Sequence, residues 1–429
     1  MASPKVAEAL AQVQSSPDPA SAFESILANL KSISTPQTVS TDLRAIIDAV
    51  FSSSQLNVVA QRAILSRLIT TVREFTNADL WVETAEHALA ALSTAAGGPQ
   101  GSGASTTGTF LDQAAALREL QADGHETNED HVSAAQALAE IPLDSSSRRV
   151  TPEDRVRVWV RIVRNYLEVD DTTSAETYLN KLKNVIYQVS DPALNLHFRL
   201  SQARIQDAKR EFLSASQAYQ DISLYPAITE DERLHTLSMA VKCAILAPAG
   251  PMRSRALGKL FKDERSPHLP EFGMLEKMFF DRLLAPGEVQ KFAEGLAPHQ
   301  LALTADGTTV LARAVVEHNL LGVSRLYSNI GFDALGLLLG LDADKAEDTT
   351  AKMIEQGRLV GRIDQIDRII WFEGGEASGE KGSGRAEVTA GKEMRRWDAN
   401  VQSLAEEVEN VTNALQREFP EFVAANLVV

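Results

Sequence analysis

Histidine is the residue of this sequence with the widest chemical use, because imidazole binds zinc and transfers protons near neutral pH. No two of the eight histidines have the His-x-His or His-x-x-x-His spacing that brings two imidazoles to one metal ion. His318 follows an apolar run on a predicted helix, and we interpret it as a surface or satisfied core histidine rather than a ligand. The sequence therefore predicts no metal site. The histidines are His87, His125, His131, His197, His235, His268, His299 and His318.

Nucleophiles and phosphate-binding loops were the next candidates for chemistry. The single cysteine, Cys243, lies in a helical apolar pattern without the local signature of a catalytic thiol, so we expect a buried, inert side chain. No Gly-x-Ser-x-Gly elbow occurs. The glycine-rich stretch at 97–108 lacks the third glycine of a dinucleotide turn, and the one that ends at Gly384 continues with Arg385 instead of Lys-Ser or Lys-Thr. We interpret both stretches as tethers and predict no catalytic residue, no cofactor and no enzyme.

The composition limits the kinds of partner and the cellular location that can be expected. The formal charge is −16 and the isoelectric point is near 5.1, which disfavours nucleic acid or an anionic membrane and suits a basic partner. One cysteine excludes an internal disulfide and fits the reducing cytoplasm and nucleus. The first residues lack the apolar core of a signal peptide, and no apolar run approaches the roughly 20 residues that span a bilayer. We therefore expect neither secretion nor membrane insertion.

The first two thirds of the chain show helical periodicity. From about residue 20 to residue 141 apolar side chains recur at helical spacing, as at Phe23, Ile26, Leu27 and Leu30. A weak repeat then places a small residue early in the second helix of successive hairpins, about 40 residues apart. This spacing predicts TPR- or HEAT-like hairpins that stack into a superhelix with a surface suited to protein docking. Coincidental alanine spacing is the alternative, and it would still leave an α-helical array. The repeat residues are Ala134, Ala175, Ala215 and Ala256.

A change of period marks the C-terminal third. The array is predicted to end near residues 267–270, and a helical adaptor leads to two further helices followed by β-type runs at 359–363 and 366–372. This order of elements is typical of a winged helix. The fold class predicted for the whole chain is therefore all-α helical repeats, a winged helix with a small β-hairpin, and a C-terminal helix.

The second helix of the predicted winged helix is acidic. In a DNA-reading winged helix this element enters the major groove. Between Asp344 and Glu355 it carries four carboxylates and only two lysines, so a phosphate backbone would be repelled. We therefore predict that the module binds protein. The charged residues are Asp344, Lys345, Glu347, Asp348, Lys352 and Glu355.

The last helix has the pattern of a bundle helix. Beyond a glycine-rich connector at 374–391, apolar residues alternate steps of three and four, which produces a narrow a/d stripe. A stripe behind a flexible tether has no evident partner in its own chain, so we expect it to dock against helices of other subunits. The alternative is that this helix folds back on the helical repeats. The stripe consists of Met394, Trp397, Val401, Leu404, Val408, Val411 and Leu415.

These residues together resemble a known family. The run at 357–373, with the Ile-Gly-Phe-Asp-Ala-Leu-Gly segment at 330–336 before it and the terminal helix after it, closely resembles the PCI domain of proteasome-lid, signalosome and translation-initiation scaffolds. Within that family the wing at 363–367 is most similar to the signalosome branch. The resemblance is strong over about residues 267–419 and weaker over the repeats. The first hundred residues match only in helical character, and the 97–108 stretch departs from the family.

The resemblance implies a non-catalytic scaffold. In such complexes the winged helices pack side by side through their hairpins by strand addition, and the C-terminal helices gather into one bundle. The implied partners are other signalosome subunits and, through the assembled complex and the projecting repeats, a cullin-RING ligase; neither nucleic acid nor membrane is implied. The assembly removes the modifier Nedd8 from the cullin, with its metal site in another subunit. A proteasome-lid subunit of the same fold and a nucleic-acid-binding winged helix remain the competing interpretations.

The resemblance also implies where partners bind and how the chain divides. The predicted division is 1–266 helical repeats, 267–373 PCI domain, 374–391 flexible linker and 392–429 bundle helix and tail. The seven residues of the terminal stripe would contact partner helices. The hairpin residues predicted to contact neighbouring subunits are Leu359, Val360, Ile363, Ile366, Ile369 and Trp371.

Overall fold

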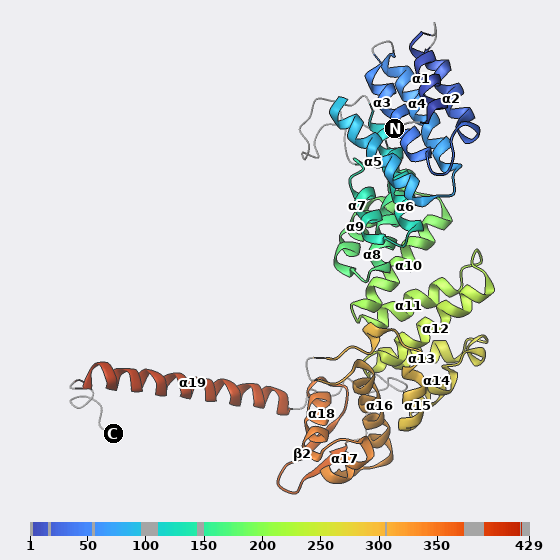
Figure 1. The fold of residues 1–429 in the computed structure, drawn as a ribbon. Helices are drawn as coiled ribbons and strands as arrows, with labels where there is room; N and C mark the ends of the chain where they lie inside the picture. Colours follow the sequence, from blue (N-terminus) through green and yellow to red (C-terminus); the bar gives the residue numbers. More distant parts are fainter. Residues whose placement is uncertain are drawn as a thin grey trace. The chain divides into compact units, whose positions relative to one another are not determined.

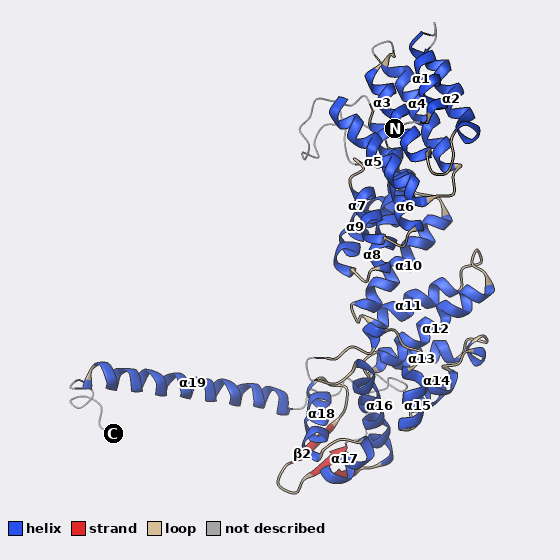
Figure 2. Cartoon of the chain, in the orientation of Figure 1, coloured by secondary structure: helices blue, strands red, loops and turns tan. Residues whose placement is uncertain are grey.

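The computed structural model describes residues 3–15, 19–53, 56–95, 110–143, 150–304, 307–372, 390–420 and 422. The predicted tether at 97–108, and the connector up to residue 389, lie outside these described residues. The chain divides into two compact units, Met1–Lys209 and Arg210–Val429. Both are mainly helical, and the named strands lie in the second unit (Figure 2). The predicted domain boundary at residue 266 stays a prediction.

The first unit is a series of packed helices (Figure 1). Helix α4 packs on α2 and α6, α5 packs on α3 and α6, and α7 contacts both α6 and α8. Two of the first helices carry proline in their first positions, where no backbone donor is lost. The helices are α1 (Pro4–Ser15), α2 (Pro19–Ile33), α3 (Val39–Ser52), α4 (Val58–Arg73), α5 (Ala78–Ala95), α6 (Leu111–Thr127), α7 (His131–Ala139), α8 (Pro152–Glu168), α9 (Thr172–Val185), the 3-10 turn η1 (Ile186–Gln188) and α10 (Pro192–Ala208).

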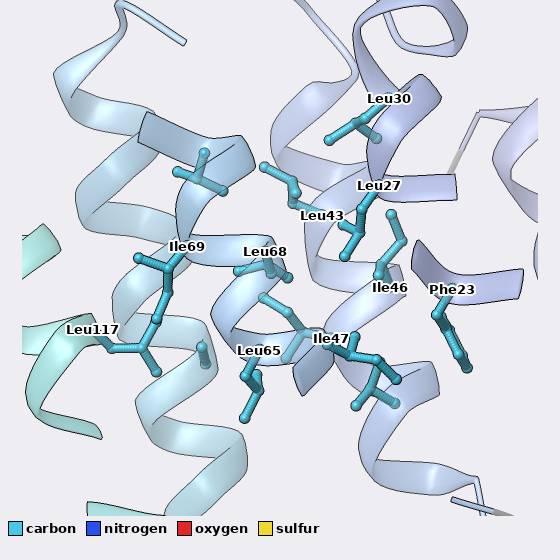
Figure 3. Close-up of a cluster of buried hydrophobic side chains, with 14 of the residues drawn as sticks. Phe23, Leu27, Leu30, Leu43, Ile46, Ile47, Leu65, Leu68, Ile69 and Leu117 are labelled. Carbon is cyan, nitrogen blue, oxygen red and sulfur yellow. The ribbon is translucent and has the colours of Figure 1, made fainter. Parts of the chain in front are cut away.

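The core of the first unit follows the helical periodicity of its sequence. Apolar side chains of α2, α3 and α4 meet in one cluster, and Leu117 of α6 faces Ile69 of α4 (Figure 3). These side chains are nearly inaccessible to solvent. Burying one large aliphatic side chain contributes about 1.5 to 3 kcal/mol to the stability of the fold. The face predicted from Phe23, Ile26, Leu27 and Leu30 is confirmed as buried.

The predicted hairpin repeat has a local structural basis. Glu129, Asp170 and Arg210 adopt left-handed backbone conformations, with φ of 61°, 59° and 64°, immediately before the N-caps of α7, α9 and α11 (Phe212–Ser223). The fourth residue of each following helix is a fully buried alanine, at 134, 175 and 215. Because φ values and alanines recur with the same steps, coincidental alanine spacing is excluded for these three positions. Ala256 is buried in the middle of α13 without such a turn before it.

The second unit starts with helices and ends with a mixed module. Helix α12 packs on α11, α13, α14 and α16, and α17 and α18 pack on each other and on α16. A capping box formed by Thr229 and Glu232 starts α12. The elements after α11 are α12 (Glu230–Leu246), α13 (Pro251–Phe261), η2 (Ser266–His268), α14 (Phe272–Phe279), α15 (Pro286–Ala293), η3 (Pro298–Gln300), α16 (Val310–Leu326), β1 (Asn329–Gly331), α17 (Phe332–Leu339), α18 (Ala343–Glu355), β2 (Gly361–Asp364), β3 (Ile369–Phe372) and α19 (Ala390–Glu418).

The segment from α16 to β3 forms a winged helix, as predicted, with one more strand than the sequence indicated. Its antiparallel sheet has the order β1-β3-β2, so β3 is the central strand. Strand β1 was missed because it has three residues and a single buried apolar side chain, Ile330, which is too short for a periodic signal. Gly361 is required where β2 meets β3, since an added Cβ would lie 2.5 Å from the Trp371 carbonyl oxygen.

The predicted strand bounds were wrong at the wing. Residues 366–368 belong to the turn, and β3 starts only at Ile369. The side chain of Asp364 ends β2, because its Oδ1 accepts the backbone N–H groups of Ile366 and Asp367 at 3.0 and 3.1 Å, which closes an Asx turn. Arg368 completes the turn with φ 54°.

Candidate protein-interaction site

A run of three polar residues lies buried in α16 and joins the winged helix to the helices before it. The Glu317 carboxylate accepts the backbone N–H of Ala249 at 3.2 Å and Nε of Arg313 at 3.1 Å, and it pairs with Arg358 ahead of β2. Asn319 accepts the backbone N–H of Leu284 at 2.9 Å. Helix α16 therefore fixes the positions of the α12–α13 loop, the α14–α15 loop and the segment that leads into β2.

Burial and neighbouring charges shift the pKa values of the charged groups in this joint. Burial by itself raises the pKa of Glu317, but the hydrogen bonds and charge of Arg358, helped by Ala249 and Arg313, outweigh burial and lower that pKa. Arg253 is fully buried, donates to the carbonyl oxygen of Ala247 at 3.2 Å, and has a pKa lowered to about 10 by desolvation. Glu317 is therefore an ionised carboxylate facing buried guanidinium groups.

His318 occupies the same joint as a neutral imidazole. Its Nε2 lies 2.9 Å from the Arg282 carbonyl oxygen and donates to it, whereas the buried Nδ1 has no hydrogen-bond partner among the described residues. Burial, followed by the charge of Arg253, lowers the pKa of His318 from 6.5 to about 4. Of the two predicted environments, surface or satisfied core, the structure shows a core histidine that has only one of its two ring nitrogens hydrogen-bonded.

The low pKa of His318 predicts a pH-dependent stability of the second unit. The unfolded imidazole binds a proton below pH 6.5 and the folded one only near pH 4, so stability is complete above 6.5 and falls as the pH drops towards 4. We expect a loss of about 3 kcal/mol at pH 4. Urea unfolding followed by circular dichroism between pH 7 and 4 measures it. His318→Gln should flatten this profile and the exposed-site control His268→Gln should not; equal slopes for both variants would contradict the prediction.

The hairpin residues predicted to contact partners divide into two groups. Leu359 is 4% exposed and packs in the winged-helix core with Ile370 and Phe372, so its side chain serves the fold of its own chain. Ile363 also packs against this core and is partly buried. Ile366, at the tip of the wing, is 94% exposed, and Trp371 is accessible beside the guanidinium of Arg362. The exposed apolar side chains of the predicted set therefore lie at the wing tip and beside β2.

The acidic helix predicted from the sequence is α18. Ala346, Thr350 and Met353 form its buried side, and Asp344, Asp348 and Glu355 remain exposed. Lys352 is paired with Asp348 at 2.9 Å, which leaves the outward face acidic. A helix that enters the major groove of DNA needs cations to contact the phosphates. The acidic outward face of α18 therefore disfavours DNA binding.

The terminal helix α19 starts at Ala390, two residues before the predicted start. Its apolar stripe is largely exposed: Trp397, Val401, Leu404, Val408 and Val411 are all accessible, and Leu415 is partly so. The side chain of Met394 lies outside the described part of the chain. An exposed stripe of this length on one helix is an apolar surface that a folded protein normally covers.

The described residues contain neither a metal-binding cluster nor a membrane-spanning helix. No group of three or more His, Cys, Asp or Glu side chains there is placed to hold a metal ion. Across the same residues, none of the helices combines the length and the apolar character needed to cross a bilayer. Cys243 is buried, as predicted.

The joint in α16 was the feature that sequence reasoning missed. Glu317 and Arg358 are 41 residues apart and Ala249 is 68 residues from Glu317, so no local spacing indicates their contact. A signal was present nonetheless. Three polar residues at 317–319 interrupt an apolar run at 314–323, and a carboxylate on such a face needs a buried partner.

The fold and its exposed surfaces define the class of protein. Helical hairpins followed by a winged helix with an acidic second helix and an unpartnered terminal helix are the attributes of a PCI-domain scaffold. Family models agree: the PCI domain matches residues 294–373, and the PSMD12/CSN4 N-terminal family matches residues 109–231.

Full-length relatives identify the family more narrowly. The COP9 signalosome complex subunit 4 of Neurospora crassa is 57% identical over 446 residues, covering all of this chain and 99% of the relative. That of Emericella nidulans is 47% identical over 96% of this chain and 97% of its own, and that of Dictyostelium discoideum is 44% identical over 73% of this chain and 76% of its own. The chain belongs to the COP9 signalosome subunit 4 family. The predicted resemblance of the chain to the signalosome branch is thereby confirmed.

Proposed function

We propose that this chain works as a non-catalytic scaffold in the signalosome, the assembly that removes Nedd8 from cullin-RING ubiquitin ligases. In this proposal the winged helix and α19 join other subunits, and the helical repeats at 1–266 reach partners or substrate. The PCI domain spans 267–373, the linker 374–391, and the bundle helix and tail 392–429. The chain acts in the cytoplasm and the nucleus, and the cullin-RING ligase meets it through the assembled complex.

The observation that carries this proposal is the exposed stripe of α19. Trp397, Val401, Leu404 and Val408 lie on one face of a 29-residue helix. Burying each such side chain against a partner contributes about 1.5 to 3 kcal/mol, so the face as a whole supports a stable bundle. A helix that served no assembly would not need this surface.

The wing adds a second, smaller contact. Because β3 is already paired on both sides, a neighbouring strand can add only at β1 or β2. Ile366 at the wing tip and Trp371 supply exposed apolar area next to β2. We therefore assign the wing to alignment of neighbouring subunits and α19 to the larger share of affinity.

Reconstitution tests the proposal. The remaining subunits of a signalosome are mixed with the full chain or with a chain that ends at residue 373, and the products are separated by size-exclusion chromatography. The full chain should enter the complex and support removal of Nedd8 from a cullin, whereas the shortened chain should elute alone. Cleavage of the neddylated cullin by the purified chain alone, or normal assembly of the shortened chain, would refute it. Preferential entry into a proteasome lid would support the competing interpretation.

A further inference from the structure

A basic surface on α13 stands out in an acidic protein. The chain has a formal charge of −16, yet residues 251–262 contain four cations and no carboxylate. Arg253 is buried, whereas Arg255, Lys259 and Lys262 are exposed at steps of four and three, which places them along one face of the helix. Neither of the interaction surfaces described above, the wing and the stripe of α19, includes these cations.

An aromatic cluster adjoins the basic face. The ring of Phe261, at the end of α13, stacks on Phe279 with centroids 4.6 Å apart and on Phe272 at 5.9 Å. Phe280 packs edge-on against Phe261 at 5.5 Å and is still 49% exposed. The guanidinium of Arg282 lies 5.3 Å from the Phe280 ring centroid. A rigid, half-open aromatic ring next to cations is typical of an interface anchor.

The cations of this surface are available for a partner. Within the described part of the chain, no carboxylate forms an ion pair with Arg255, Lys259, Lys262 or Arg282. Of the nearby acids, Asp263 pairs with Arg265 and Asp281 pairs with Arg325, whereas Glu264 and Glu276 offset at most two of the four cations. The surface therefore keeps an unbalanced positive potential beside an apolar anchor.

We infer that Arg255, Lys259, Phe261, Lys262, Phe280 and Arg282, here termed the α13–α14 patch, bind an acidic protein segment that ends in a bulky apolar residue. The distance from residue 255 to residue 262 along the helix is about 10 Å, at 1.5 Å per residue. An extended segment covers it with about three or four residues. Two alternate carboxylates of that segment would lie over the cations of α13, and the apolar residue would cover Phe280 within reach of Arg282.

Charge favours a short protein segment over nucleic acid. A nucleic acid carries phosphates well beyond both ends of the patch, where this acidic chain would repel them. A segment with a few carboxylates ends within the patch. The inference uses only the charge and packing of α13 and α14, so it holds or fails independently of the function proposed above.

Fluorescence anisotropy with the full chain tests the inference. The probe is a labelled peptide of four alternating aspartate and glutamate residues followed by a leucine and a phenylalanine. We expect saturable binding that weakens at least about tenfold in the double variant Lys259→Glu, Lys262→Glu, because two attractive charges become repulsive. Phe280→Ser should also weaken binding about tenfold by removing the aromatic anchor.

Matched controls make each outcome decisive. Lys181→Glu with Lys183→Glu imposes the same charge change on exposed lysines of α9 and should leave peptide affinity unchanged. Should the glutamate variant of the patch lose its circular-dichroism melting transition, Lys259→Gln with Lys262→Gln replaces it, with a smaller loss expected. The inference is overturned by equal losses in the α9 control, by equal binding of a peptide without its apolar residues, by no saturable binding, or by tighter binding of a single-stranded oligonucleotide of the same charge.

Discussion

Replacing Leu404 and Val408 together by aspartate is expected to lower the affinity of the chain for the other subunits of its assembly by about a thousandfold or more. The two side chains are 61% and 58% exposed in the free chain, so the change leaves the protein folded. In a helical bundle the same positions would be buried, and two carboxylates there would lose apolar contact and lack partners. Co-purification and isothermal titration with the remaining subunits measure the loss.

The opposite face of α19 provides the control. Gln402 and Asn413 lie about half a turn away from the stripe, at 100° per residue, and both are exposed. Replacing both by aspartate introduces the same charges and a similar penalty in helix propensity. This control should assemble normally and show the same helical circular dichroism. Equal losses in the two double variants would mean that charge or helix content, and not the stripe, governs assembly.

Glu317→Ala is expected to destabilise the second unit by about 3 to 5 kcal/mol, because it leaves Arg358 buried without a counter-charge. The carboxylate is almost fully buried, and its loss also removes the acceptor of the Ala249 backbone N–H. Urea unfolding by circular dichroism should show a lower midpoint. Hydrogen exchange should show the loss of protection in α16 and β2, because Arg358 at the entry to β2 is joined to α16 through this carboxylate.

Two further variants separate charge from packing. Glu288→Ala removes a carboxylate of the same unit that pairs with Lys277 at the surface, and it should leave the urea midpoint unchanged within error. The double variant Glu317→Gln, Arg358→Met should be more stable than Glu317→Ala, because neither member of the pair is then a buried, unpaired charge. A midpoint for Glu317→Ala that equals the parent's would show that the pair is dispensable.

The sequence contained enough information for the helical elements and for the winged helix. Periodic apolar positions such as Leu27 and Leu43 depend only on local geometry, and the structure buries them. A turn between the two predicted β-type runs was expected, but its length was not. The side chain of Asp364 closes an Asx turn that includes Ile366, so β3 starts at Ile369 instead of at the predicted residue 366.

What could not be predicted depends on distant partners. Leu359 looks like an exposed strand residue in sequence, and only the packing of Ile370 and Phe372 around it makes it a core residue. Likewise nothing near Glu317 indicates Arg358, because pairing across 41 residues is set by tertiary structure. Contacts with other chains are still harder to predict, because they depend on residues that are absent from this sequence. The stripe of α19 has a pattern that indicates burial, but the pattern carries no information on which protein buries it.

The strand order of the small sheet determines when this sheet can form during synthesis of the chain. Ile330 of β1 pairs with Ile370 of β3, forty residues later, so the sheet cannot close until the wing has left the ribosome. The hairpins of the first unit have partners close by in sequence and can stack as they emerge. A nascent chain that stalls after α16 would therefore display Leu320 and Val323, which the finished sheet module covers, and would attract chaperones.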